Sequence, residues 1–376
     1  MNDKQVLLQP GQTRTETVRV WPGYWLLCAC LFMITCQTTE RRAAEHQTTN
    51  RQNAELSRPI TPAFYHWKTT YKPTLSEVDQ LKILKIKKLY IHFFDVDWDS
   101  RTRQAVPKAF VTFRQKPITS VVPVVFITNR TLMNLPPAGV TELATHITQA
   151  ITRISQQNAI RFSEVQIDCD WSVRTRDRYF RLLTLLANQL HCPLSATIRL
   201  HQIKYTDQTG IPSVARGMLM LYNVADWKRA DTRNSIYDAD VANQYLSFVS
   251  TYPLPLDVVL PLFRWTVVYR NNRFLTFLNN IDRKTLANFD FLAPQPDTMR
   301  FRATRDTVAF GFSIWRGDLF RAEAVTPEAL VNEKDRLVDL IQNQQVTFAF
   351  YHLDSTVLSS YSRETLQTLF RTRPLP

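Results

Sequence analysis

Glycine and cysteine are scarce in this chain of 376 residues, which has seven glycines and five cysteines. No G-x-G-x-x-G sequence is present, so the phosphate loop of a doubly wound dinucleotide-binding sheet is not indicated. Three cysteines lie in or directly after an apolar N-terminal run, and the two that remain, Cys169 and Cys192, are too few for a disulfide framework and are expected to stay unpaired.

The chain also lacks a basic-aromatic motif typical of nucleic-acid binding, so no nucleic-acid partner is expected. Its formal charge is nevertheless +13. This charge indicates a generally basic surface, which favours acidic partners such as anionic glycans or lipid head groups.

The apolar run at residues 21–35 is too short for a comfortable transmembrane helix but has the length of a signal peptide. It ends at Cys36, and the sequence there resembles the lipobox of bacterial lipoproteins, although Thr35 stands where Gly, Ala or Ser is usual. The resemblance implies that residues 1–35 are removed and that Cys36 is lipidated. An uncleaved membrane anchor is the alternative. Both predict a chain tethered outside the cytoplasm, in the bacterial cell envelope.

Residues 36–60 are polar and predict a flexible tether, so the folded domain is expected to span residues 61–376. Strand-like and helix-like segments alternate through this domain, with helical periodicity at 140–154 and 179–186 and a helix start at Thr326. The strand-like segments are 64–67, 89–96, 120–127, 165–170, 194–200, 218–222, 258–263 and 348–353. Eight such units predict an α/β fold of the (β/α)8, or TIM-barrel, type.

Residues 279–325 are too many for a simple crossover between the last two strands of such a barrel. Alternating polar and apolar residues occur around 299–303 and 308–315, followed by a turn at 316–318. The segment is therefore predicted to be a β-hairpin insertion between strands seven and eight.

The functional face of a TIM barrel is formed by the carboxyl ends of its strands. Strand alternation places Asp168 and Asp170 on one side of a buried strand, where unpaired carboxylates would be costly. Tryptophan and other aromatic side chains follow several strands, and aromatic faces beside polar groups suit sugar rings. The residues predicted to bind substrate are Trp67, Asp95, Asp97, Trp98, Trp171, Asn223, Arg264, Trp265, Tyr351 and Asp354.

Each of these predictions has a structural alternative. The tryptophans could close the top of the barrel, and the two aspartates could form a hydrogen-bond network with Arg199 or Arg264. His92, inside a strand, is predicted to serve packing. The histidines near strand ends, His66, His201 and His352, are expected in hydrogen-bond networks rather than on a metal.

Two of the strand ends resemble the family 18 glycoside hydrolases, the chitinase-type barrels. That family has D-x-x-D-x-D-x-E at strand four and M-x-Y-[DN] at strand six; this chain has V-x-x-D-x-D-x-S at 165–172 and M-L-Y-N at 220–223. The resemblance implies a catalytic set in which Asp170 orients an acetamido group of the substrate, Asp168 is its partner and Tyr222 supports the reacting amide. The chain is also similar to uncharacterised bacterial barrel lipoproteins.

Ser172 stands where that family has its general-acid glutamate, and a serine hydroxyl cannot protonate a glycosidic oxygen. The sequence therefore predicts a glycan-directed, glycoside hydrolase-like barrel whose activity is either lost or carried by other carboxylates, such as Asp95, Asp97 or Asp354. It leaves open whether the chain is an enzyme. No cofactor is expected, and the expected partners are a glycan and, through the N-terminal lipid, a membrane.

Two alternatives stay open. One is a non-catalytic glycan-binding protein or envelope scaffold. The other is a metal-dependent phosphoester hydrolase that would use Asp95, Asp168, Asp170, His66 and His352.

Overall fold

A computed structural model of the protein describes residues 59–297 and 299–371. The predicted signal peptide, Cys36 and the tether up to residue 58 lie outside these residues. None of the helices in the described ranges is long and apolar enough to cross a membrane.

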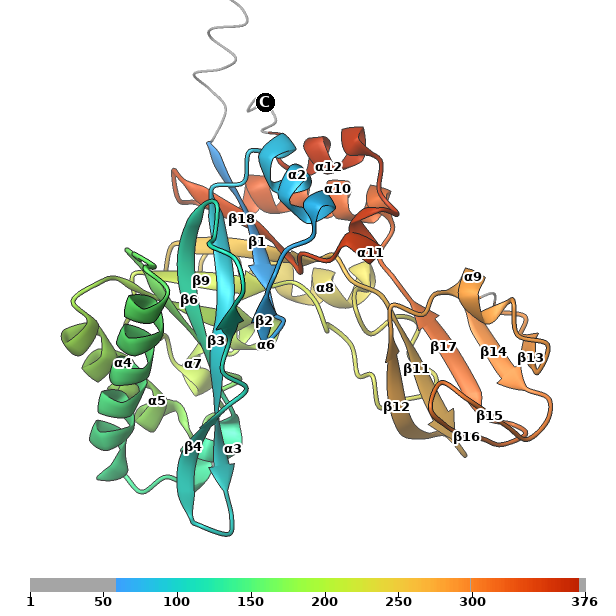
Figure 1. Ribbon diagram of the computed structural model, residues 1–376, viewed down its shortest axis with the longest axis horizontal. Coiled ribbons are helices and arrows are strands. Elements are labelled where there is room, and N and C mark those ends of the chain that lie inside the picture. Colours follow the sequence, from blue (N-terminus) through green and yellow to red (C-terminus); the bar gives the residue numbers. More distant parts are fainter. Residues whose placement is uncertain (1–58, 298, 372–376) are drawn as a thin grey trace, which may run out of the picture. The chain divides into compact units, whose positions relative to one another are not determined.

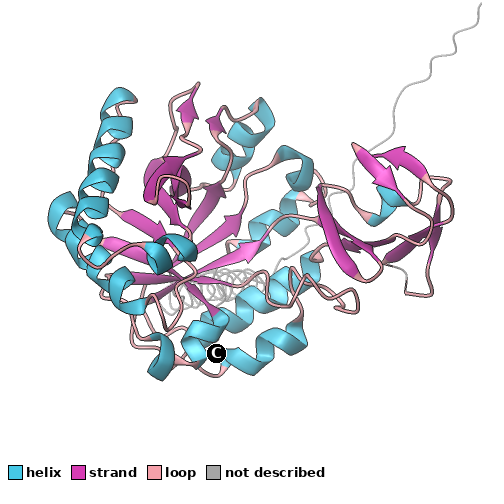
Figure 2. Ribbon diagram, turned by 90° about the horizontal axis from the view of Figure 1, so that it is seen from below, coloured by secondary structure: helices cyan, strands magenta, loops and turns pink. Residues whose placement is uncertain are grey.

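Eight parallel strands close into a barrel surrounded by helices (Figures 1 and 2). The barrel closes because β1 pairs with both the last strand, β18, and the second, β3. The barrel strands are β1 (Ile60–His66), β3 (Lys88–Asp99), β6 (Ser120–Ile127), β7 (Val165–Asp168), β8 (Leu194–Arg199), β9 (Arg216–Met220), β10 (Leu256–Pro261) and β18 (Val346–Tyr351). Each predicted strand overlaps one of these, which confirms the predicted TIM barrel.

Helices cover the outside of the barrel at the predicted places. The apolar stripe at 140–154 forms the buried face of α4 (Gly139–Gln157), and the stripe at 179–186 forms that of α5 (Arg176–Leu190). Thr326 caps α10 (Pro327–Leu340), its hydroxyl accepting a hydrogen bond from Ala329 N at 3.2 Å. The other helices are α2 (Leu75–Ile83), α3 (Asn129–Asn134), α6 (Leu200–Lys204), α7 (Thr206–Thr209), α8 (Ala239–Leu246), α9 (Arg283–Leu286), α11 (Ser355–Leu358) and α12 (Arg363–Leu369).

The barrel interior is filled by its own side chains. Tyr65 and Tyr90 stack with ring centroids 4.9 Å apart, and the Tyr65 hydroxyl donates a hydrogen bond to Gln166 at 2.5 Å. Side chains packed in this way fill the centre of the barrel, which is therefore not an open channel.

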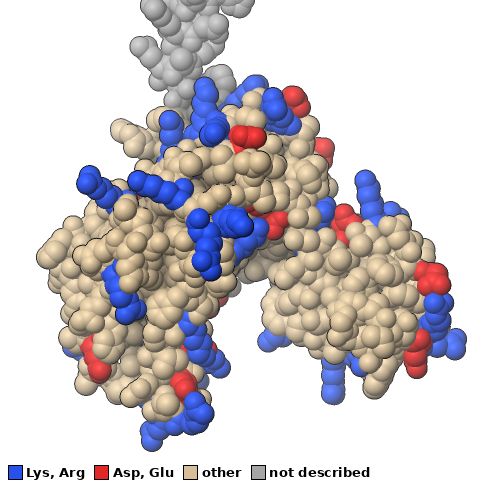
Figure 3. Space-filling view, viewed as in Figure 1, with Lys and Arg blue, Asp and Glu red and all other residues tan. Residues whose placement is uncertain are grey.

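The connection from β3 to β6 consists of strands. β4 (Gln104–Lys108) runs antiparallel to β3, and β5 (Thr112–Phe113) pairs with β2 (Thr70–Tyr71). Outside the barrel, Figure 3 shows Lys and Arg side chains spread over the visible face, with fewer acidic ones among them.

Between β10 and β18 the chain forms a five-stranded antiparallel sheet. The predicted single hairpin from residue 279 is not confirmed, because the inserted strands begin at Trp265. Asn271 and Asn272, with φ of 50° and 59°, form a two-residue turn between the first two of them. The inserted strands are β11 (Trp265–Arg270), β12 (Arg273–Asn279), β13 (Leu292–Pro294), β14 (Arg300–Ala303), β17 (Leu319–Glu323) and a separate hairpin of β15 (Thr307–Ala309) and β16 (Phe312–Ile314).

Candidate functional site

A cavity of about 470 Å³ opens at the carboxyl ends of the barrel strands. It brings together nine of the residues predicted from the sequence: Trp67, Asp168, Asp170, Tyr222, Asn223, Arg264, Trp265, Tyr351 and Asp354. The lining also includes Phe126, Arg199, Phe263, Asn279, Asn280 and His352. We call this space the barrel-top cavity.

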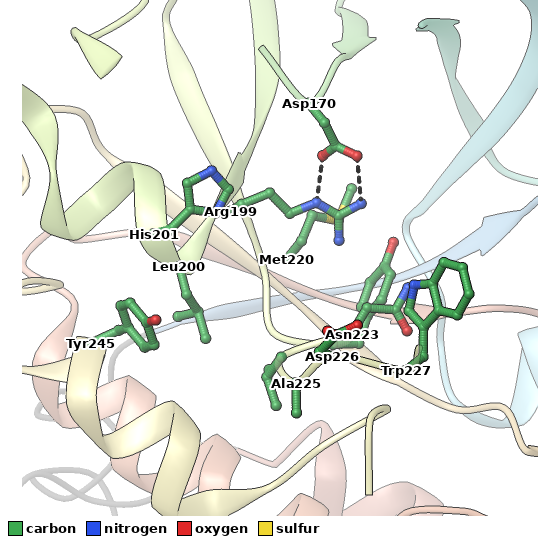
Figure 4. A pocket seen from close by; sticks show the side chains of 12 residues that line it. Asp170, Arg199, Leu200, His201, Met220, Asn223, Ala225, Asp226, Trp227 and Tyr245 are labelled. Carbon is green, nitrogen blue, oxygen red and sulfur yellow. Dashed lines mark hydrogen bonds and ion pairs between the residues drawn. The ribbon is translucent and has the colours of Figure 1, made fainter. Parts of the chain in front are cut away.

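A second cavity of about 410 Å³ adjoins it and shares four lining residues with it: Asp170, Arg199, Tyr222 and Asn223 (Figure 4). Its other lining residues include His201, Asp226 and Trp227.

Aromatic rings form much of the wall of the barrel-top cavity. Tyr351 stacks on Tyr222 with centroids 5.1 Å apart and lies 5.6 Å from the ring of Trp67. On another side, Trp265 packs against Phe263 at 5.2 Å. The Trp265 indole N–H donates to the buried carboxylate of Glu323 at 2.7 Å, which fixes the ring. Rings held in this way present fixed apolar faces beside polar groups.

Asp168 ends β7 and is only 6% exposed. Its carboxylate accepts a hydrogen bond from the Thr197 hydroxyl at 2.7 Å. Burial, and then the neighbouring charge of Asp170, raise the pKa of Asp168 to about 6, although Arg199 opposes the shift. A carboxyl with such a pKa can hold a proton near neutral pH.

Asp170 is half-exposed and paired with Arg199, whose Nε lies 2.6 Å from Oδ1 (Figure 4). The same guanidinium lies 5.6 Å from the ring centroid of Tyr222. The structural alternative of a network between Asp170 and Arg199 is therefore present. The family resemblance implies that Asp170 contacts the substrate, but its carboxylate is already paired with Arg199.

Ser172 lines neither cavity. Its backbone N–H donates to the Thr175 hydroxyl at 2.9 Å, and its carbonyl accepts from the N–H groups of Thr175 and Arg176, both at 2.9 Å. The residue thus belongs to the turn that starts α5. Position 172, where the family has its general acid, therefore supplies no acid to either cavity.

Trp171 was predicted to bind substrate, and the structure corrects this. The side chain is 1% exposed, stacks on Tyr179 at 5.1 Å and donates its indole N–H to the carbonyl of Thr209 at 2.9 Å. The chain leaves β7 after Asp168, so the turn that follows sets the direction of Trp171, whose ring packs in the core against Tyr179 of α5.

Three more predicted residues lie outside both cavities. Asp97 accepts hydrogen bonds from Arg130, from Lys108 at 2.9 Å and from Thr128 at 2.9 Å, and so joins β3, β4 and α3. Trp98 lines a separate cavity beside β4 and α4. Asp95 is paired with His92, with 2.6 Å between its Oδ1 and His92 Nε2.

His92 is buried and packs inside the barrel, as predicted, but its pairing with Asp95 carried no sequence signal. Its ring lies 4.8 Å from that of Trp67. Phe126 and Phe263 carried no sequence signal either, since apolar residues within strands are expected in any core. Asn279 and Asn280 were missed because the extent of the inserted sheet was not predicted.

Within residues 59–297 and 299–371, no group of three or more His, Cys, Asp or Glu side chains is arranged to hold a metal ion. The five residues considered for metal-dependent phosphoester hydrolysis are not gathered into such a group. Cys169 and Cys192 are both free, as predicted.

The fold is a TIM barrel similar to those of solved chitinases. Similar solved structures include the chitinase of Chromobacterium violaceum ATCC 12472, with 11% identity and a TM-score of 0.51, covering 84% of this chain and 100% of that one. The GH18 chitinase ChiB of Flavobacterium johnsoniae has 10% identity and a TM-score of 0.51, with 84% and 94% covered. The spore cortex-lytic enzyme SleL of Bacillus megaterium QM B1551 also has 10% identity and a TM-score of 0.51, with 85% and 76% covered. The chain matches no protein-family model and none of the curated proteins.

Proposed function

We propose that this protein binds a glycan in the barrel-top cavity and does not use position 172 as a general acid. The observation that carries the proposal is the lining of the cavity, where fixed aromatic rings stand beside carboxylates, amides and two arginines. Sugar rings offer apolar C–H faces and hydroxyl rims, which such a lining can match. The chitinase fold adds support, because the cavity lies at the functional end of the barrel.

The family's own route to hydrolysis lacks two of its parts. Ser172 is held in a turn and cannot donate a proton to a glycosidic oxygen. Asp170 is engaged by Arg199, so an acetamido group would have to compete with an ion pair at 2.6 Å. Binding of a glycan in the barrel-top cavity does not depend on that mechanism.

Hydrolysis by other carboxylates is the second candidate function. It is favoured by Asp168, whose raised pKa of about 6 suits a group that delivers a proton.

We further propose that the protein is a lipoprotein of the bacterial cell envelope, with its lipid on Cys36. The support is the apolar run at 21–35 and the polar segment that follows it.

The direct test is to apply the purified protein to arrays of amino-sugar and acidic glycans. We expect the wild type to bind at least one class of glycan. Tyr222→Phe and Trp67→Ala should each bind that glycan more weakly. Failure to bind any member of either class would contradict a glycan-binding cavity and favour the scaffold alternative.

A further inference from the structure

A bulge in β3 brings two polar side chains onto one face of the strand. Residues three apart in a regular strand point to opposite faces. Here the register shifts between His92 and Phe94, and Phe93 and Phe94 both pack into the core outside the barrel. His92 and Asp95 consequently share the inner face. Their side chains meet, with 2.6 Å between His92 Nε2 and Asp95 Oδ1.

This dyad lies at the level of Asp168. Strand pairing places Asp95 beside Phe126 on β6, and Phe126 beside Asp168 on β7. Neighbouring strands are about 4.8 Å apart, so the Cα atoms of Asp95 and Asp168 are roughly 10 Å apart. Phe126 and Asp168 line the barrel-top cavity, as does Trp67, which contacts the ring of His92. Asp95, with its side chain 32% exposed, therefore stands across Phe126 from Asp168.

The hydrogen bonding of His92 defines its role. The residue is 3% exposed, and its Nδ1 has no hydrogen-bond partner among the described residues. A buried Nδ1–H without an acceptor would cost free energy, so the ring is expected to carry its hydrogen on Nε2. His92 then donates to Asp95 Oδ1, which leaves the other carboxylate oxygen available to accept a proton. His92 is thus a positioning residue for Asp95.

We propose that Asp95, oriented by His92, and Asp168 form the working carboxyl pair of an inverting glycoside hydrolase in this barrel. The inference rests on the proposed binding of a glycan in the barrel-top cavity. Inverting glycosidases use one carboxylic acid and one carboxylate, with the two carboxyl groups about 6.5–9.5 Å apart to leave room for a water molecule. Two inward-pointing side chains on strands separated by one other strand fit that spacing.

Hydrolysis of the glycosidic bond by this pair needs only water. Asp168 gives its proton to the glycosidic oxygen, and the bond from that oxygen to the anomeric carbon breaks with its electron pair passing to the oxygen. Water attacks the anomeric carbon from the opposite face and loses a proton to Asp95. The products are an alcohol and a sugar with the inverted anomeric hydroxyl, and proton exchange with solvent restores both carboxyls.

The test uses the full-length protein and chitotetraose, with binding measured by calorimetry and turnover by product analysis. We expect hydrolysis, and proton NMR immediately after mixing should show the inverted anomer first. Asp95→Asn and Asp168→Asn should each lower kcat about 100-fold or more, with KM little changed. Asp99→Asn is the matched control on the same strand. Its carboxylate accepts hydrogen bonds from Arg101 and Thr102 in the following turn and lines neither cavity, so turnover should stay at the wild-type level.

A second readout distinguishes a proton acceptor from a structural residue. Azide attacks without losing a proton, so it should restore turnover to Asp95→Ala and give the inverted glycosyl azide, but it should not rescue Asp168→Asn. His92→Ala should lower kcat and His92→Gln should restore part of it, with the thermal midpoint of each variant recorded.

Chitotetraose that binds but is not cleaved would overturn the carboxyl pair and leave glycan binding intact. Full activity of Asp95→Asn, or product of retained configuration, would overturn it too. Absence of binding would remove the premise and the inference together.

Discussion

The buried carboxyl of Asp168 predicts how stability should depend on pH, and Asp168→Asn is the perturbation that isolates it. In the folded protein its pKa is raised to about 6, mainly by burial, whereas the unfolded chain should titrate near 3.8. As pH rises from 4 to 6, the unfolded state loses its proton while the folded state retains it. The wild type is therefore expected to lose stability through this interval, and most of the loss should be complete above pH 6.

The magnitude follows from the two pKa values. A difference of about two units, at about 1.4 kcal/mol each, corresponds to roughly 3 kcal/mol. Asparagine keeps the shape and can still accept the hydrogen bond from Thr197, but it does not ionise. The free energy of unfolding of Asp168→Asn minus that of the wild type should therefore rise by about 3 kcal/mol between pH 3.5 and pH 7.5.

Urea denaturation at a series of pH values measures this difference, and Asp97→Asn supplies a control of opposite sign. Hydrogen bonds from Arg130 and Lys108 lower the pKa of Asp97, so its contribution to stability should be present above about pH 4 and be lost as pH falls. A difference curve for Asp168→Asn that is flat, or that falls with rising pH, would refute the account of Asp168 as a buried carboxyl that retains its proton.

Other predictions concern the N-terminus and the core. A fatty-acid analogue should label the wild-type protein in cells but not Cys36→Ser, and persistent labelling of the variant would contradict lipidation there. Trp171→Ala should lower the free energy of unfolding by about 3–5 kcal/mol in a denaturant titration, because it empties a buried site. A change below 1 kcal/mol would show that the ring is not in the core. Iodoacetamide should modify partly exposed Cys192 in the folded protein and fully buried Cys169 only after unfolding, as mass analysis of the two peptides would show.

The barrel could be predicted because each of its strands is a short apolar run separated from the next by a turn or an amphipathic helix. The stripe at 140–154 shows this, since burial of one face of α4 against the barrel is what its spacing encodes. The start of the inserted sheet could not be placed, because only Leu262, Phe263 and Arg264 separate β10 from β11 and none of them is a typical turn residue.

Some residues of the candidate site could likewise be predicted from the sequence, and others could not. Side chains directly at strand ends, such as Asp168 and Tyr351, have directions fixed by strand alternation, so they could be placed in advance. Trp171 could not, because its direction depends on a turn after the strand. The pairing of His92 with Asp95 depends on a bulge that alternation alone cannot reveal.

The central claim is that the barrel-top cavity holds a glycan against its aromatic wall. Calorimetric titration of chitotetraose into the wild type, Trp67→Ala and Trp315→Ala tests it most directly, because Trp67 lines the cavity while Trp315 is an exposed tryptophan outside it. Loss of ring stacking should weaken binding to Trp67→Ala by about 1 kcal/mol or more, roughly fivefold, with Trp315→Ala equal to the wild type. Equal affinities for all three proteins, or weakening only in Trp315→Ala, would contradict the claim.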